Sequence, residues 1–217
     1  MRYAENHKEE THKALLKVAA VHLREKGPDR LSVSQVMKGA GLTHGGFYAH
    51  FKSKDALLNE TLNDIFTKAR RRVARMLEGL PPKHALATYI DFYVSSNHRD
   101  NPQDGCPITA LNSDMPRQSK KFRAAFEAGV KQLVDLLEIR IDAAGVEDAA
   151  KLAPAIFSAM AGAVALSRTI SDPDLSDEFL ASTRASLKAR LGLTELALAS
   201  EPVPPTVPVP ANDHRHL

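Results

Sequence analysis

The sequence predicts an all-α protein of about nine helices, in which a small N-terminal domain of three helices is joined by a long helix to a larger helical domain. Apolar residues recur at helical spacing in almost every segment of the 217 residues, and no segment shows the sustained alternation typical of strands. Glycine and proline separate these segments at the points where helices end. The 43% hydrophobic and 25% charged residues are typical of a globular chain and exclude wholesale disorder.

The first three helices are short and follow one another closely. The first has a periodic apolar face and ends at Gly27, because the following Pro-Asp cannot continue it. Ser32 is a good N-cap for a second helix from Val33 to about Gly39. Gly41 can take the positive φ of a tight turn, and Thr43 is the N-cap of the third helix.

Longer helices follow, beginning with one that Ser53 caps and that runs to about Leu80. The stretch 98–105 is expected to be a loop, and Pro107 to be the first residue of a short helix. The other helices are expected over residues 83–97, 118–144, 148–170 and 174–191. The predicted domains are 1–55, 56–193 and a disordered Pro-rich tail, 194–217, since its last 17 residues hold five of the 13 prolines.

Residues 33–51 carry the pattern of a helix-turn-helix, in which the second helix enters the DNA major groove. The second helix starts with residues 43–46 (THGG), which are small or polar where a core helix would be bulky. Each glycine costs a helix about 1 kcal/mol relative to alanine, and close approach of the backbone to another molecule would account for that cost. Free N–H groups at a helix start suit a phosphate. The alternative is an ordinary helical hairpin with a polar surface.

Residues 12–58 resemble the N-terminal DNA-binding domain of the TetR family of transcriptional regulators. The matching positions are Gly27, Ala40-Gly41-Leu42, Phe47-Tyr48-Ala49-His50-Phe51 and Ser53-Lys54-Asp55. The resemblance implies a helix-turn-helix domain followed by a helical ligand-binding and dimerisation domain. Two departures, Leu31-Ser32 in place of two hydroxyl residues and Met37 in place of a small alanine, are interpreted as packing variants.

The resemblance also implies which residues contact DNA. Thr43, His44 and Tyr48 would meet DNA, with His44 as the base contact, and Gly45 and Gly46 would let the backbone come close. Phosphate contacts are expected from Tyr48, His50 and Lys54, and from Ser34 or Gln35 on the preceding helix. For His50 the alternative is a role in helix packing. Family members bind as dimers, so the expected partner is a near-palindromic double-stranded operator.

Two further sets of residues are expected in the larger domain. A homodimer interface is implied on the last two long helices, with the alternative that both apolar seams face the protomer's own core; its members are Ala155, Ala159, Ala163, Ser167, Leu180, Thr183, Leu187 and Leu191. A pocket for an unidentified small molecule is implied between helices, although each lining candidate is also consistent with plain core. These candidates are Phe66, Tyr89, Phe92, Tyr93, Cys106, Met115, Phe122 and Phe126.

Cys106 is the single cysteine, which excludes an intrachain disulfide and any multi-cysteine metal site. At a helix N-cap the helix dipole favours the thiolate. The segment Asp104–Pro107 resembles a TetR-family subset with a Gly-Cys start to helix six, some members of which respond to electrophiles or oxidants. The alternative is a buried or idle thiol.

The charge distribution agrees with a polyanion partner for the N-terminal part alone. Residues 1–80 hold 15 Lys and Arg against 9 Asp and Glu, whereas the rest hold 14 against 17. No signal peptide, membrane span, catalytic set, metal site or cofactor motif is predicted, so we expect a cytoplasmic regulator, most simply a repressor. The alternatives are an all-helical small-molecule binding protein or enzyme without specific DNA binding, and a constitutive or activating regulator.

Overall fold

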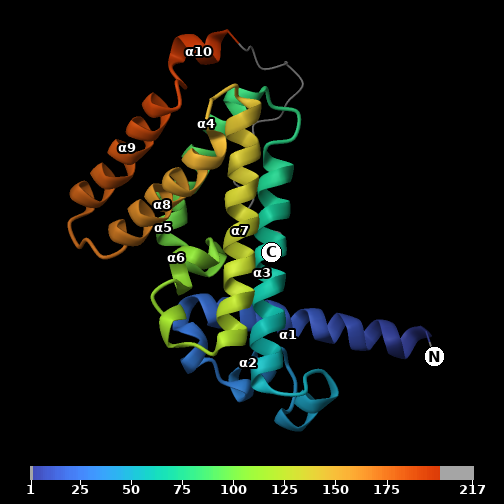
Figure 1. Ribbon diagram of the computed structural model, residues 1–217. Helices are drawn as coiled ribbons and strands as arrows, with labels where there is room; N and C mark the ends of the chain where they lie inside the picture. The colour runs from blue at the N-terminus through green and yellow to red at the C-terminus, as the bar shows by residue number, and fades with distance from the viewer. Residues whose placement is uncertain (1, 201–217) are drawn as a thin grey trace. The chain divides into compact units, whose positions relative to one another are not determined.

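The computed structural model describes residues 2–200, and every regular element in that range is helical (Figure 1). The α-helices are α1 (Arg2–Arg30), α2 (Val33–Gly39), α3 (Lys54–Met76), α4 (Pro82–Tyr93), α5 (Ser96–Asp100), α6 (Pro107–Leu111), α7 (Lys120–Ala143), α8 (Ala149–Ser167), α9 (Pro173–Arg190) and α10 (Glu195–Ala199). Three 3₁₀-helices are η1 (His44–Ala49), η2 (Pro102–Asp104) and η3 (Met115–Arg117). The predicted all-α class is confirmed.

The described residues form two compact units. Unit 1 contains residues 2–68 and 102–129, and unit 2 contains residues 69–101 and 130–200. The helices α3 and α7 each begin in unit 1 and continue into unit 2. The predicted N-terminal domain, 1–55, is therefore part of a larger unit that also holds η2, α6, η3 and the start of α7.

Unit 1 is held together by bonds between α1 and this later segment. The Arg24 guanidinium donates to the Gln103 carbonyl at 2.9 Å, and the Gln118 amide donates to the Asp29 carboxylate at 3.0 Å. Gly27 has a φ of 77°, so the regular helix is interrupted at the residue where the sequence predicts its end, and helical residues continue to Arg30 after the kink. A Cβ at that position would also lie 2.9 Å from a carboxylate oxygen of Asp114, so this glycine lets the η3 segment approach α1.

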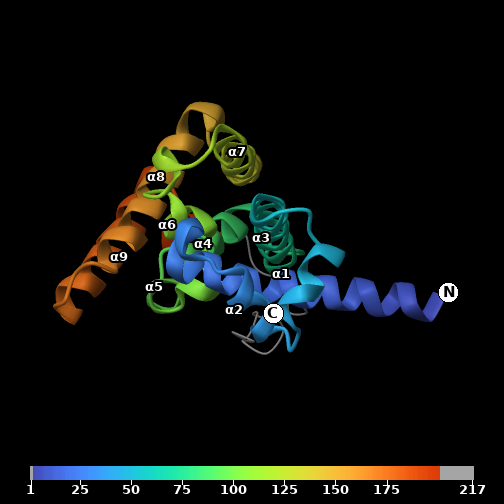
Figure 2. The ribbon, with the colours of Figure 1, turned by 90° about the horizontal axis from the view of Figure 1, so that it is seen from below.

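In unit 2, α8 and α9 lie side by side, as Figures 1 and 2 both show. Arginine side chains join the elements: Arg184 donates to the Val94 carbonyl at 2.6 Å, and Arg168 donates to the His98 carbonyl at 2.7 Å. Arg99 forms an ion pair with Asp177 at 2.6 Å.

The expected element boundaries are largely confirmed, with three corrections. The predicted helix 83–97 ends at Tyr93, and the expected loop 98–105 contains the end of α5 and all of η2. The third helix of the N-terminal domain is the 3₁₀-helix η1. The predicted tail begins with a helix, α10, in which the Thr194 hydroxyl accepts a bond from the Ala197 N–H at 3.2 Å. Residues 201–217, the remainder of that tail, lie outside the described residues.

The most apolar helix is α8, with a mean hydropathy of 1.6. By length and composition alone it is the one described helix able to cross a membrane, but the buried core helix of a soluble protein passes the same test. Within the chain 39% of this stretch is buried, including Ile156, Phe157, Met160 and Val164.

Candidate nucleic-acid interface

The turn between α2 and η1 is fixed by a small core and by backbone bonds. Val36 and Met37 on α2 are each 1% exposed. The Leu42 N–H donates to the Met37 carbonyl at 2.9 Å, and the Gly41 N–H donates to the Lys38 carbonyl at 3.0 Å. Gly41 has the predicted positive φ, at 73°. The two elements therefore meet in the helix-turn-helix arrangement that the sequence predicts.

One edge of η1 is buried and the other is open to solvent. Phe47 and Phe51 are each 3% exposed, and their rings stack with centroids 5.7 Å apart. Tyr48 is 74% exposed, and its ring forms a T-shaped pair with that of Phe47. Because the phenylalanines anchor η1 from within, the Tyr48 hydroxyl is presented outward.

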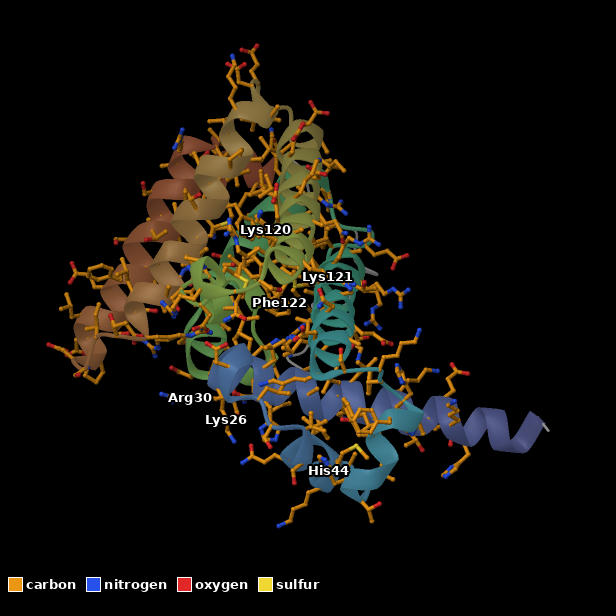
Figure 3. All side chains as sticks on the ribbon, turned by 60° about the horizontal axis from the view of Figure 1, so that its bottom comes forward. Lys26, Arg30, His44, Lys120, Lys121 and Phe122 are labelled. Carbon is orange, nitrogen blue, oxygen red and sulfur yellow. The ribbon has the colours of Figure 1, made fainter. Side chains whose placement is uncertain are left out.

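The start of η1 is not required for packing inside the chain. Thr43, His44 and Gly45 are exposed, and Thr43 makes no side-chain capping bond (Figure 3 labels His44). A Cβ at Gly45 would meet nothing within 4 Å, and one at Gly46 would lie 3.4 Å from the Met37 side chain. Packing within the chain therefore does not require a glycine at position 45. A glycine is expected there if the backbone approaches a binding partner closely.

The other predicted contact residues border this face. Ser34 and Gln35 are exposed in the first turn of α2. Lys54 begins α3, whose start is capped by a bond from the Ala56 N–H to the Ser53 hydroxyl at 3.1 Å. The Lys54 ammonium donates to the Asp29 carbonyl at 3.2 Å, and it retains further donors for a phosphate.

His50 lies at the C-terminal end of η1 and packs against α1. Its ring centroid is 6.0 Å from that of His12, and its Nδ1 is buried without a hydrogen-bond partner among the described residues. Burial lowers the pKa of His50, and the positive charges of His12 and Lys8 lower the pKa further. A neutral imidazole attracts phosphate weakly, so this geometry favours the packing alternative for His50.

Two basic residues near this face were not singled out in the sequence. Lys26 and Arg30, at the end of α1, are exposed and form no ion pair with a described residue. Figure 3 labels both on the same side of unit 1 as His44. In the sequence they could have been found by their position, because both lie within seven residues before the start of α2.

Comparison with known proteins identifies the family. Residues 15–61 match the family model of bacterial regulatory proteins of the tetR family, and residues 82–175 match the C-terminal domain of LmrA/YxaF-like transcriptional regulators. The chain belongs to the TetR family.

Relatives and solved structures agree with this TetR-family assignment. The chain is 35% identical over 68 residues to the uncharacterised regulator YdgC of Bacillus subtilis, covering 31% of this chain and 35% of that protein. It is 32% identical over 88 residues to the repressor KstR2 of Rhodococcus jostii, covering 39% and 43%. It spans about half or less of these relatives' lengths. A TetR-family structure from Agrobacterium tumefaciens has the same fold, with a TM-score of 0.72 at 20% identity over 84% of this chain and 98% of that one.

The TetR-family pocket candidates divide between the two units. In unit 1, Phe66, Met115, Phe122 and Phe126 are buried, and the Phe66 and Phe126 rings meet edge to face at 5.7 Å. Gly129 makes this contact possible, because a Cβ there would lie 2.2 Å from the Phe66 ring.

In unit 2, Tyr89 and Tyr93 are buried, and their rings meet edge to face at 6.2 Å. Phe92 is partly buried beneath the Arg72 guanidinium, which lies 4.9 Å from its ring centroid. The burial of Tyr89 and Tyr93 is what the alternative of plain core packing expects for these two candidates.

The residues expected at the dimer interface are mostly packed within the chain. Ala163, Ser167, Leu180, Leu187 and Leu191 are buried, as the alternative of an internal seam expects, and Thr183 is half-buried. Ala155 and Ala159 are exposed. Large apolar side chains are exposed on the same helix pair, at Leu166, Leu175 and Phe179.

Cys106 stands at the N-cap of α6, as predicted, and is partly exposed. Its carbonyl accepts a bond from the Thr109 hydroxyl at 3.0 Å. Because α6 has only five residues, its dipole is short and supports a thiolate less than the sequence argument assumed.

Proposed function

We propose that this TetR-family protein is a DNA-binding transcriptional regulator whose reading surface is the exposed edge of η1 with the start of α2. The observation that carries the proposal is the start of η1, where Thr43, His44 and Gly45 are exposed and Gly45 has open space around it that unit 1 does not fill. His44 supplies a base contact, and Tyr48, Lys54 and Ser34 or Gln35 contact phosphates.

The regulator acts as a homodimer on a near-palindromic double-stranded operator. The exposed face of α8 and α9, with Ala155, Ala159, Leu166, Leu175 and Phe179, is the interface that supports this proposal. Small residues permit close approach of a second copy, and the larger ones supply apolar area to bury. The protein is a cytoplasmic repressor, and the similarity to a protein named as a repressor supports this part.

Release from the operator follows effector binding or modification of Cys106. The structural support is the position of Cys106 two residues after η2, which Arg24 on α1 bonds through the Gln103 carbonyl. The same helix α1 packs beneath the helix-turn-helix, within the same unit. An electrophile whose carbon forms a bond to the Cys106 sulfur would therefore disturb a segment bonded to the DNA-reading unit.

The test is fluorescence anisotropy with the DNA upstream of the protein's own gene. Wild-type protein is expected to bind one sequence selectively, with His44→Ala relaxing the selectivity and Tyr48→Phe weakening the affinity. An electrophile is expected to abolish binding by the wild type and to leave Cys106→Ser unaffected. Selective binding that is indifferent to electrophile would contradict the thiol route alone. Binding no stronger than to random DNA, after a wider site search, would favour the small-molecule binding protein.

A further inference from the structure

An open groove lies in unit 1 between η3 and the first two turns of α7. Its volume is about 460 Å³, within the usual range for small-molecule sites. All of its lining comes from residues 112–127, which form one continuous part of unit 1.

The floor of the groove is apolar and fixed in place. Met115 and Phe126 form it, and they are 7% and 9% exposed. Phe126 is held by the edge-to-face contact with Phe66, which the absent side chain of Gly129 permits. Because these side chains are already ordered, binding the apolar part of a ligand on them would cost little conformational entropy.

The rim of the groove carries positive charge that the chain does not neutralise. Lys120 and Arg123 line it, are exposed, and make no side-chain hydrogen bond or ion pair with a described residue. The nearby carboxylate of Asp114 forms an ion pair with Arg117 at 3.1 Å.

One carboxylate, Glu127, also lines the groove. It follows Arg123 by four residues, about 6 Å along the helix axis, and Lys120 by seven, about 10 Å, so positive charge lies toward the start of α7 and negative charge toward residue 127.

We propose that this groove binds an organic carboxylate with an apolar body, and that this ligand is the effector of the regulator proposed above. The carboxylate bonds to Lys120 and Arg123, and the apolar body lies on Met115 and Phe126. Charge complementarity sets this orientation, because the reverse one would bring the ligand's anion to Glu127.

The first test is calorimetric titration of the full chain with octanoate, without DNA. Octanoate is expected to bind saturably, whereas acetate lacks the apolar body and 1-octanol lacks the charge, so neither should match it. The variant Lys120→Gln/Arg123→Gln is expected to raise the Kd about tenfold or more, because charge-assisted hydrogen bonds to an anion are strong.

The chain offers matched controls for charge and for space. Lys121 is the exposed neighbour of Lys120 and does not line the groove, so Lys121→Gln should leave the Kd unchanged (Figure 3 labels both lysines beside buried Phe122). Ala124→Phe should block the groove, whereas Ala128→Phe, also exposed but outside the lining, should not.

Several results would overturn the site. These are an absence of saturable octanoate binding up to about 1 mM, equal binding of octanol, or an equal loss in Lys121→Gln. These measurements contain no DNA, so they test the site even if the proposed operator binding fails.

In a second experiment octanoate is added to the operator complex, and it is expected to release the wild type but not the Lys120→Gln/Arg123→Gln variant. Binding of octanoate without release would overturn its role as effector.

Discussion

Gly45 is a position where the fold does not require a glycine but a close DNA contact would. A Cβ there meets nothing, whereas a Cβ at Gly39 would lie 2.7 Å from a methyl carbon of Val18. We therefore expect Gly45→Ala to leave the free energy of unfolding unchanged or to raise it by up to about 1 kcal/mol. The same substitution should weaken operator binding about tenfold or more, because the added methyl group keeps the backbone away from DNA.

Urea unfolding and anisotropy on the same samples check this prediction. Gly39→Ala is the control for sensitivity, and it should lose about 1–3 kcal/mol of stability through overpacking. An operator affinity of Gly45→Ala equal to that of the wild type would remove the argument that the η1 start approaches DNA closely.

His50 gives unit 1 a dependence on pH. Its pKa is lowered in the folded protein, chiefly by burial and then by the charges of His12 and Lys8. Well above the ordinary histidine pKa of about 6.5 the imidazole is neutral in both states, so its contribution is constant. As the pH falls further, the unfolded chain takes up the proton first and stability declines.

The groups facing His50 are His12, which pairs with Glu60, and Lys8 and Glu9 from the same helix. Urea midpoints at pH 7.5 and 5.5 should therefore differ more in the wild type than in His50→Gln. The exposed residue His44 supplies the control, since His44→Gln should keep the wild-type difference. If His50→Gln also kept it, the pH dependence would arise elsewhere.

At the scale of elements, sequence reasoning succeeded where local chemistry decides the structure. Gly27 interrupts α1, Gly41 forms the turn after α2 and Ser53 caps the start of α3, and each of these effects depends on only a few neighbouring residues. By contrast, the end of α5, residues 98–100, lies in a stretch that the sequence predicts to be loop. The start of α5 is capped by the Ser95 hydroxyl, but its His98 and Arg99 carbonyls are bonded by Arg168, which is about 70 residues away. Such long-range partners are not visible in a local pattern.

The apolar seams of α8 and α9 show the same limit. Periodicity groups Leu180, Leu187 and Leu191 on one face, but it does not say whether that face meets the chain's own core or a second chain. All three are buried within one chain, whereas Leu166, Leu175 and Phe179 are exposed. In the helix-turn-helix, the sequence alone indicated which residue types stand at the start of η1. The packing of His50 against His12 could not be predicted in this way, because it joins residues 38 positions apart.

Substitutions on the exposed face of α8 and α9 test the interface. Leu166→Glu and Phe179→Glu should convert the dimer to a monomer, because a carboxylate at an apolar interface loses its hydration without gaining a partner. Light scattering after size exclusion measures the mass directly. Ile139, which is 64% exposed on α7, gives the matched control, and Ile139→Glu should remain dimeric. Dimers in both α8 and α9 variants would place the interface on another surface.

At the scale of the whole molecule, the excess of positive charge in the first 80 residues should govern how DNA binding responds to salt. Each phosphate neutralised by a protein cation releases counterions, so the logarithm of the binding constant falls with the logarithm of salt concentration by about 0.9 per contact.

If Lys26 and Arg30 contact phosphates beside α2, then Lys26→Ala and Arg30→Ala should each reduce that slope by about 0.9 and weaken binding to all DNA sequences alike. His44→Ala should leave the slope unchanged while relaxing sequence preference, because base contacts specify and phosphate contacts position. Lys131→Ala is the control in unit 2, since that lysine is exposed and paired with Asp135 at 2.7 Å. An equal change of slope in Lys131→Ala would mean that the net charge of the chain, rather than two defined contacts, sets the salt dependence.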